Sequence, residues 1–304
     1  GITLEAIVRT VFGIADPAEV GCWSDVVGGF VKTASASMLA MFLPFLRHDF
    51  GGVGPWARFQ RVRRTYDAMV DAEAARRRAL PESGPPAEDI MSLLLASRFE
   101  DGAAMSDSEL RDQLVSILVA GNETTATVLT WALYWLGRHP AVVQHVRDEI
   151  GPLGDAFDPM ALARLPYLEA VCHETLRLNP ILPDVPRWLR EPMALRGYDL
   201  PAGISVAAAT VLVHYDPDVY PEPEAFRPER FLARPPTPFT FLAFGGGNRR
   251  CLGAAFALYE LKVVIATLVM AYDFHPGPDV PVRLVRRNMT IGPAGGVPMR
   301  LTAR

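Results

Sequence analysis

The chain has 304 residues, of which 50% are hydrophobic and 21% are charged, a balance typical of globular proteins. Its formal net charge of −4 and the lack of a long basic run argue against nucleic acid as a main ligand. Three cysteines, Cys22, Cys172 and Cys251, lie far apart and give no disulfide framework, which fits a reducing compartment. The apolar run at 263–272 is too short to span a bilayer, and no signal-peptide pattern opens the chain.

The first part of the chain has apolar residues at helical spacing. This spacing predicts helices over 2–12, 23–43 and 56–80, and a shorter helix over 89–98. A loop rich in proline and glycine is expected over 80–89.

A long helix is expected next, with Ser106 as its N-cap. Glu109 stands three residues later and completes a capping box. The pattern continues to Gly137, so about 30 residues with a rise of 1.5 Å each predict a rod of roughly 45 Å. Residues 114–136 are apolar on nearly every side, and the helix is therefore expected to be central and buried.

Two further helices that begin with proline are expected over 140–150 and 166–179. The helical residue pattern ends after residue 180. Short β-like runs occupy 193–201 and 204–213, and a proline-rich, non-helical meander follows over 215–231.

The end of the chain combines a helix over 252–272 with strands around a Gly/Pro turn, at 280–287 and 297–304. The predicted fold class is mainly α with a minor β part. The length allows one large domain or two ordinary ones. We expect the chain to be mostly helical over 1–180, to have β, meander and loop structure over 181–251, and to end in a helix and a β turn over 252–304.

A lone cysteine stands in the stretch FGGGNRRCLG at 244–253. Glycines at 245–247 allow a tight turn that presents backbone N–H groups. A helix begins after Cys251, and Arg249 and Arg250 add positive potential. The N–H groups of the turn, the helix start and the arginines all favour the thiolate, which is the form of cysteine that binds metal. The alternative is a buried structural thiol, the commonest fate of a free cysteine.

Other motifs do not fit this stretch. A GxGxxG reading fails at Arg250, and the chain has no GxxxxGK[ST] phosphate loop. A catalytic cysteine would need a positioned histidine, and the nearest in sequence, His214 and His275, have no supporting pattern.

The segment HETLR at 173–177 nearly matches the zinc-protease pattern HExxH, but it ends in Arg177. Glu174 and Arg177 are three residues apart on one helix face and can form an ion pair. As a surface pair they would contribute under about 1 kcal/mol. Apolar neighbours favour burial instead, and Arg230 in the segment PERF could complete a Glu–Arg–Arg network.

The segment AGNETT at 120–125 interrupts the long apolar helix. Gly121 costs about 1 kcal/mol there relative to alanine. Thr124 could simply bond back to the carbonyl of Ala120, which bends helices. Alternatively, Gly121 opens a groove, and Glu123 and Thr124 handle water and protons beside a reactive centre. Both interpretations remain open on this segment alone.

Four segments together resemble the cytochrome P450 haem-thiolate monooxygenases. FGGGNRRCLG matches the FxxGxRxCxG loop of that family, ETLR its ExxR helix, PERF its PxRF meander and AGNETT its [AG]Gx[DE]T[TS] motif. The four occur in the family's order and extend over essentially the whole chain. The resemblance therefore implies a P450-type fold, N-terminally incomplete, with the long central helix over haem. It also implies that residues 1–304 form a single, partial haem-thiolate monooxygenase domain.

The resemblance implies haem b as the cofactor and Cys251 as the proximal thiolate ligand of its iron. Arg249 and Arg187 would bind the haem propionates, and Phe244 would pack near the sulfur. The loop glycines would let N–H groups reach the sulfur; these are Gly245, Gly247 and Gly253.

On the oxygen side, the resemblance implies that Glu123 and Thr124 deliver protons to O2, and that Ala120 and Gly121 flank the oxygen groove. The structural triad would hold the proximal side, and its members are Glu174, Arg177 and Arg230. Substrate contacts are expected at Leu118, Leu182, Pro183, Val185, Ile291 and Pro293.

The implied reaction inserts one oxygen atom of O2 into a small organic substrate and releases the other atom as water. The apolar lining favours an apolar substrate. Electrons would come from NAD(P)H through a ferredoxin or reductase-type donor. We expect a cytoplasmic monomer, although an N-terminal portion that precedes Gly1 could have held a membrane anchor.

The family carries a further N-terminal portion that nothing in this sequence matches. We therefore expect weak haem retention and poor stability of this chain. The rival hypotheses are a peroxide-driven or isomerising haem-thiolate enzyme, a truncated haem-binding or inert protein without catalysis, and, more distantly, a zinc hydrolase.

Overall fold

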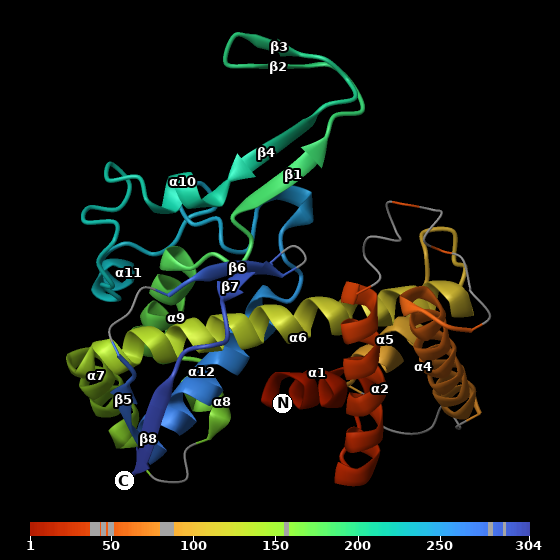
Figure 1. The fold of residues 1–304 in the computed structure, drawn as a ribbon, viewed down its shortest axis with the longest axis horizontal. Coiled ribbons are helices and arrows are strands. Elements are labelled where there is room, and N and C mark those ends of the chain that lie inside the picture. Colours follow the sequence, from red (N-terminus) through yellow and green to blue (C-terminus); the bar gives the residue numbers. More distant parts are fainter. Residues whose placement is uncertain are drawn as a thin grey trace. The chain divides into compact units, whose positions relative to one another are not determined.

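The computed structural model describes residues 1–36, 43, 47, 52–79, 88–154, 158–278, 282–287 and 290–304. The chain divides into two compact units, Gly1–Glu123 and Thr124–Arg304 (Figure 1). The division falls inside the long helix α6 (Asp107–Arg138), which follows the predicted rod closely. Each unit is described by itself below.

The first unit is helical, as predicted. Besides the first half of α6 it contains α1 (Ile2–Phe12), α2 (Pro17–Ala36), α4 (Pro55–Arg78) and α5 (Ile90–Ala96). The structure does not describe residues 37–42 of the predicted second helix. Residues 80–87 of the predicted loop also lie outside the described residues.

Helix α2 begins earlier than the apolar pattern predicted. Asp16 caps it, because its Oδ1 accepts hydrogen bonds from the backbone N–H groups of Ala18 and Glu19. Pro17 occupies the first helical position, where its missing N–H costs nothing. The start of α6 follows prediction: the Glu109 N–H donates to Ser106 Oγ, and the Ser106 N–H donates to the Glu109 carboxylate.

One buried arginine ties the first unit together. Arg77 of α4 forms ion pairs with Glu73 on its own helix and with Asp89, the N-cap of α5. It also donates to the carbonyl of Phe12 at the end of α1. Three helices are therefore fixed to one guanidinium.

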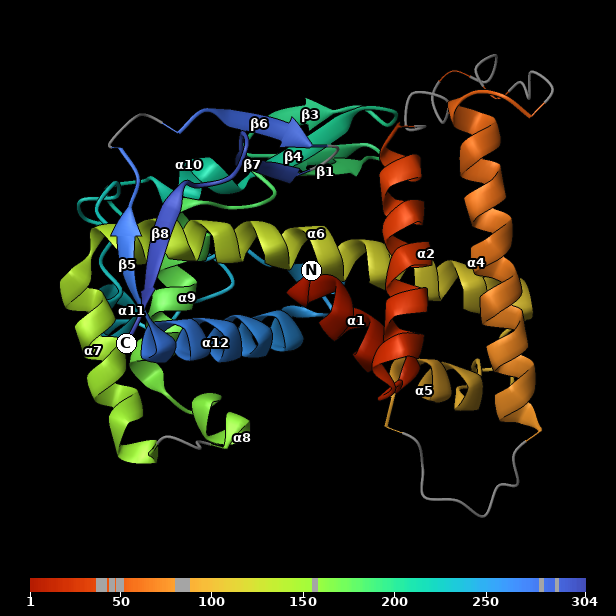
Figure 2. The same cartoon turned by 60° about the horizontal axis from the view of Figure 1, so that its bottom comes forward.

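The helices of the second unit follow the second half of α6. They are α7 (Pro140–Ile150), η2 (Gly151–Leu153), α8 (Pro159–Leu162), α9 (Pro166–Leu178), α10 (Thr210–His214), α11 (Glu229–Ala233), η3 (Gly247–Arg249) and α12 (Ala254–Ala271). Figure 2 shows α12 running beside α9, and the core of this unit lies among α6, α7, α9 and α12.

In the described part of the second unit, the strands form four two-stranded antiparallel ladders. In chain order they are β1 (Asp184–Trp188), β2 (Met193–Leu195), β3 (Tyr198–Leu200), β4 (Ser205–Ala209), β5 (Tyr272–Pro276), β6 (Leu284–Arg287), β7 (Thr290–Pro293) and β8 (Met299–Ala303). The pairs are β1 with β4, β2 with β3, β5 with β8 and β6 with β7.

Three predicted elements differ from the structure. The β-like run at 204–213 is a strand only to Ala209, because the chain then turns into α10, whose His214 is fixed by buried hydrogen bonds. The end of the non-helical meander is the short helix α11. The two tail strands do not pair with each other: β6 pairs with β7, and β8 pairs with β5, which the sequence prediction missed.

Helix α12 is the one helix among the described residues that is long and apolar enough to cross a membrane. The apolar run at 263–272, judged too short from the sequence, is only part of it. Core helices meet the same criterion, and Lys262 of α12 lies buried in an ion pair with Glu169 of α9.

Candidate functional site

The lone cysteine lies on a backbone loop that is closed by its own hydrogen bonds. The Cys251 N–H donates to the carbonyl of Phe244 at 2.8 Å, and the Gly245 N–H donates to the carbonyl of Leu242 at 2.9 Å. Cys251 is exposed, so the structure does not support the buried structural thiol. We call residues 242–251 the cysteine loop.

Two glycines of the cysteine loop adopt the left-handed conformation that other residues avoid. Gly245 has a φ of 66° and Gly247 a φ of 62°. Gly253 instead has an ordinary backbone conformation and is the N-cap of α12. Because α12 begins at Ala254, its positive end lies three residues beyond the thiol.

A cavity of about 420 Å³ lies against the cysteine loop. Gly245, Gly246 and Leu242 line it from the loop, Arg187 and Val185 from β1, and Thr210 from the start of α10. Its other lining residues are apolar: Leu189, Met193, Val206 and Ala208. The structure thus brings the predicted residue Arg187 to the cysteine loop from some 60 positions earlier in the chain.

The polar groups of this cavity fit an anionic ligand. The Arg187 guanidinium donates to the carbonyl of Pro186 and has no carboxylate partner among the described residues. Thr210 is fully buried, and its Oγ1 has no hydrogen-bond partner in the described part of the chain. The Arg187 guanidinium is therefore the group of this cavity that can pair with a carboxylate of a cofactor.

The structure brings Glu174, Arg177 and Arg230 together. The carboxylate of Glu174 accepts from Arg177 Nε at 2.7 Å and from Arg230 Nε at 3.0 Å. The side chains of Glu174 and Arg177 are 0% exposed, so this is a buried network and not a surface pair.

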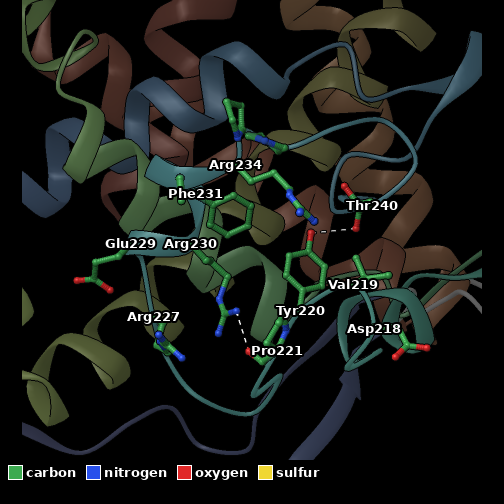
Figure 3. A pocket seen from close by; sticks show the side chains of 13 residues that line it. Asp218, Val219, Tyr220, Pro221, Arg227, Glu229, Arg230, Phe231, Arg234 and Thr240 are labelled. Atoms are coloured by element: carbon green, nitrogen blue, oxygen red, sulfur yellow. Dashed lines mark hydrogen bonds between the residues drawn. The ribbon is translucent and has the colours of Figure 1, made fainter.

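Arg177 also fixes the course of the meander. Its guanidinium donates to the carbonyls of His214, Pro223 and Ala225. Arg230 donates to the carbonyl of Pro221, beside a cavity of about 500 Å³ that also contains Tyr220 and Phe231 (Figure 3). The network therefore holds the main chain of the meander as well as the two arginines.

His214, which had no supporting sequence pattern, connects this network to the cysteine loop. It is fully buried, and its ring stacks on Phe241 with centroids 5.4 Å apart. Nδ1 lies 3.0 Å from the carbonyl oxygen of Arg177, and Nε2 lies 2.9 Å from the N–H nitrogen of Leu242. Burial lowers the pKa of His214 to about 4, so the imidazole is neutral at neutral pH.

The AGNETT segment lies in the middle of α6. Ala120 is exposed, and Gly121, Glu123 and Thr124 are half-buried. Gly121 allows a close approach of α1, because a Cβ at this position would lie 2.9 Å from Ile7 Cδ1. Helix packing within the first unit is therefore a sufficient reason for this glycine. The boundary between the two units falls within this segment. Residues 120–123 belong to the first unit, and residues 124 and 125 belong to the second.

The predicted substrate contacts fall into different places. Pro183 and Ile291 line one cavity of about 180 Å³ together with Trp131. The Ile291 N–H donates to the carbonyl of Ile181, which holds β7 against the segment after α9. The remaining predicted contacts do not line this cavity: Val185 lines the cavity at the cysteine loop, Leu182 is exposed, Pro293 is buried in β7, and Leu118 is fully buried in the first unit.

Among the described residues, no three His, Cys, Asp or Glu side chains lie close enough to hold a metal ion by themselves. A single exposed thiol on a loop that lines a cavity instead suits a metal whose other ligands come from a cofactor.

The model of the family described as Cytochrome P450 matches residues 2–295 of this chain. The chain belongs to the cytochrome P450 family. Cytochrome P450 135B1 of Mycobacterium tuberculosis is 38% identical over 302 residues, which cover 99% of this chain and 62% of that protein. Cytochrome P450 137 of the same species is 35% identical over 299 residues, covering 98% and 60%. The chain thus spans about three fifths of the length of these P450 relatives.

Two solved P450 structures share the fold. A retinoic acid-bound cyanobacterial CYP120A1 has a TM-score of 0.81 and 28% identity, with 100% of this chain and 67% of that chain covered. The cytochrome P450DA heme domain has a TM-score of 0.84 and 24% identity, with 100% and 66% covered. These similarities confirm the predicted family and the predicted fold class.

Proposed function

We propose that this P450 chain acts in a haem-dependent monooxygenase that inserts one oxygen atom of O2 into a small, apolar organic substrate. The observation that carries the proposal is the exposed thiol of Cys251, held on a glycine-rich loop beside a cavity lined by Arg187, a cation without a carboxylate partner among the described residues. Both units would act as one haem-thiolate domain in a cytoplasmic monomer. Electrons from NAD(P)H would arrive through a ferredoxin or reductase-type donor.

In this proposal Cys251 holds the iron of haem b through its thiolate. Arg187 and Arg249, both exposed and without a carboxylate partner among the described residues, bind the haem carboxylates. Phe244 would pack near the sulfur, and its carbonyl accepts from the Cys251 N–H.

Bound haem supplies the activation of O2, which no protein side chain can provide. The role of this chain is to hold substrate and to manage protons. Glu123 and Thr124 would pass protons through a carboxylate and a hydroxyl on α6, and Ala120 would flank the oxygen groove. Apolar residues would hold the substrate and exclude water from it, with Pro183, Val185 and Ile291 as the proposed contacts.

The test is the absorption spectrum of the haem-supplied chain, reduced and bound to carbon monoxide. We expect a long-wavelength thiolate-type Soret band that Cys251→Ala abolishes. Cys22→Ala is the matched control, because Cys22 is also exposed and should not alter the band. A histidine-type band in the unaltered chain, or a thiolate band that survives Cys251→Ala, would overturn the proposal.

A further inference from the structure

Every hydrogen-bonding group of the buried His214 side chain is used, and the two bonds run to different elements. A carbonyl oxygen can only accept, so Nδ1 carries the proton and donates to Arg177. The Leu242 N–H can only donate, so Nε2 is the acceptor. These contacts fix one neutral tautomer. The ring therefore spans from the last turn of α9 to the first residue of the cysteine loop.

Leu242 is the first residue of the cysteine loop, and both of its backbone polar groups are hydrogen-bonded. Its carbonyl accepts from the Gly245 N–H at 2.9 Å, while its own N–H is committed to His214. Two residues later the carbonyl of Phe244 accepts from the Cys251 N–H. A displacement at Leu242 would pass directly into the backbone that carries the thiol.

No backbone carbonyl accepts from the Leu242 N–H among the described residues, and His214 Nε2 is its acceptor. Because a partly buried N–H is destabilised when it loses its partner, the loop prefers the position in which the imidazole accepts. The backbone carbonyl of Arg177 holds the imidazole from the other side. The Glu174 carboxylate in turn accepts from the Arg177 side chain and from Arg230. A chain of hydrogen bonds thus reaches from the buried ion-pair network to the cysteine loop.

We infer that His214 is a positioning residue that sets the height and register of the cysteine loop through the Leu242 N–H. The inference rests on the proposed function in so far as the loop presents Cys251 to iron. The position of the loop itself is a property of the polypeptide and can be measured without haem.

Three substitutions separate the two hydrogen bonds from ring packing. His214→Gln can place an amide oxygen near the position of Nε2 and keep the acceptor for Leu242. His214→Asn can place an amide N–H near the position of Nδ1 and keep only the donor to Arg177. His214→Phe keeps a ring stacked on Phe241 and removes both bonds.

The first measurement is amide hydrogen exchange of the full chain without haem. In His214→Phe and His214→Asn we expect the Leu242 amide and the peptide over 242–251 to exchange about ten- to a hundredfold faster than in the unaltered chain. His214→Gln should stay within about threefold. Amides of α9 and α12 should be unchanged. Equal protection in Asn and Gln, unchanged exchange in Phe, or a uniform rise that includes α9 and α12 would each overturn the inference.

The second measurement is the reduced carbon monoxide spectrum of the same variants supplied with haem. Phe and Asn should convert a large share of the thiolate-type band to a non-thiolate band, and Gln should retain it. Full retention in Phe would overturn the link between the loop position and the thiol. If the unaltered chain gives no thiolate band, the proposed function fails, and the exchange measurement still decides whether His214 positions the loop.

Discussion

Glu260 is a buried carboxylic acid in α12 that lacks a partner. It is 7% exposed, and neither carboxylate oxygen has a hydrogen-bond partner among the described residues. Burial raises its pKa from 4.5 to about 7, because leaving water penalises the charged form. A raised carboxyl pKa means that the folded state holds the proton more tightly. The stabilising contribution is therefore complete below pH 4.5 and is lost as the pH rises through about 7.

We therefore expect Glu260→Gln to increase the free energy of unfolding at pH 8 by on the order of 1–3 kcal/mol, and to have little effect near pH 4.5. Urea unfolding at the two pH values measures this. Glu100→Gln is the control, since Glu100 is exposed. A loss of stability at pH 8 would mean that the carboxylate makes a favourable interaction that the amide cannot.

His173 should have the opposite pH dependence. It is 6% exposed and packs against the rings of Phe231 and Phe241. Burial lowers its pKa from 6.5 to about 4, so the stability that the neutral ring contributes is present above pH 6.5 and is lost as the pH falls through about 4.

In His173→Phe we expect the loss of unfolding free energy between pH 6.5 and pH 4 to be smaller by on the order of 1–3 kcal/mol. His214 has a similarly lowered pKa, so part of the acid sensitivity should remain. The measurement is urea unfolding across this range, with His275→Phe at a more exposed position as the control. An unchanged acid slope in His173→Phe would contradict the expectation.

The ion pairs of the second unit are expected to contribute very different amounts to the free energy of unfolding. The Arg230 side chain, 12% exposed, pairs with the fully buried Glu174. Arg227, three residues earlier in the same segment, is 53% exposed and pairs with the exposed Glu222. Removing one partner of a buried pair leaves an uncompensated charge, whereas exposed pairs are screened by water.

We expect Arg230→Ala to lower the free energy of unfolding by about 3 kcal/mol and Arg227→Ala by less than about 1 kcal/mol. Urea unfolding at pH 7 compares the two variants directly. Similar losses would show that Arg177 alone satisfies Glu174.

Backbone conformation within the cysteine loop gives an equally direct comparison. Gly246 and Gly247 both have open space where a Cβ would be added. They differ in φ, which is −153° at Gly246 and 62° at Gly247. Only the second value belongs to the left-handed region, where an L-residue is strained by roughly 1–2 kcal/mol.

Gly247→Ala should therefore destabilise the chain by about 1–2 kcal/mol, while Gly246→Ala should be neutral or slightly stabilising. Thermal and urea unfolding of the two variants test this. The added Cβ meets open space at both positions, so only the difference in φ can separate the two variants. Equal effects of the two alanines on the free energy of unfolding would therefore contradict the expectation.

Sequence signals were sufficient where a structural feature is local. The capping box at Ser106 and the proline starts at Pro140 and Pro166 placed three helices correctly. The strand-like residues before His214 were misread, because buried hydrogen bonds from distant segments override their β propensity. The β5–β8 pairing was missed for the same reason: its two strands are joined only in the folded chain.

The candidate site was predictable to the extent that it follows spaced motifs. Cys251, Glu174, Arg177 and Arg230 carry recognisable patterns, and the last three do meet in the structure. His214 carries none, since its position matters only through what the fold brings beside it. Such residues become visible only when hydrogen bonds are counted in three dimensions.

At the scale of the second unit, the cavity at the cysteine loop is assembled from three segments far apart in sequence, namely 185–193, 206–210 and 242–246. The cavity is thus a property of the folded unit and not of one motif. The charge in this cavity comes from Arg187, while the neighbouring Arg190 does not line it.

We expect Arg187→Ala to weaken haem binding about ten- to a hundredfold, as for the loss of one charge-assisted hydrogen bond. Arg190→Ala should change it by less than about threefold. Haem titration followed by absorption measures both. Equal affinity in Arg187→Ala and the unaltered chain would remove Arg187 from the proposed site.

The contacts of Arg177 also suggest the order in which parts of the second unit fold. Its pairing with Glu174 spans three residues, whereas its bonds to the carbonyls of His214, Pro223 and Ala225 span 37 to 48. Short-range contacts close much faster than long loops, because the entropy of loop closure grows with length. The pair on α9 can thus form first and offer its remaining N–H groups as a template. The meander, and with it the cysteine loop, would then be among the last parts of the second unit to acquire their native course.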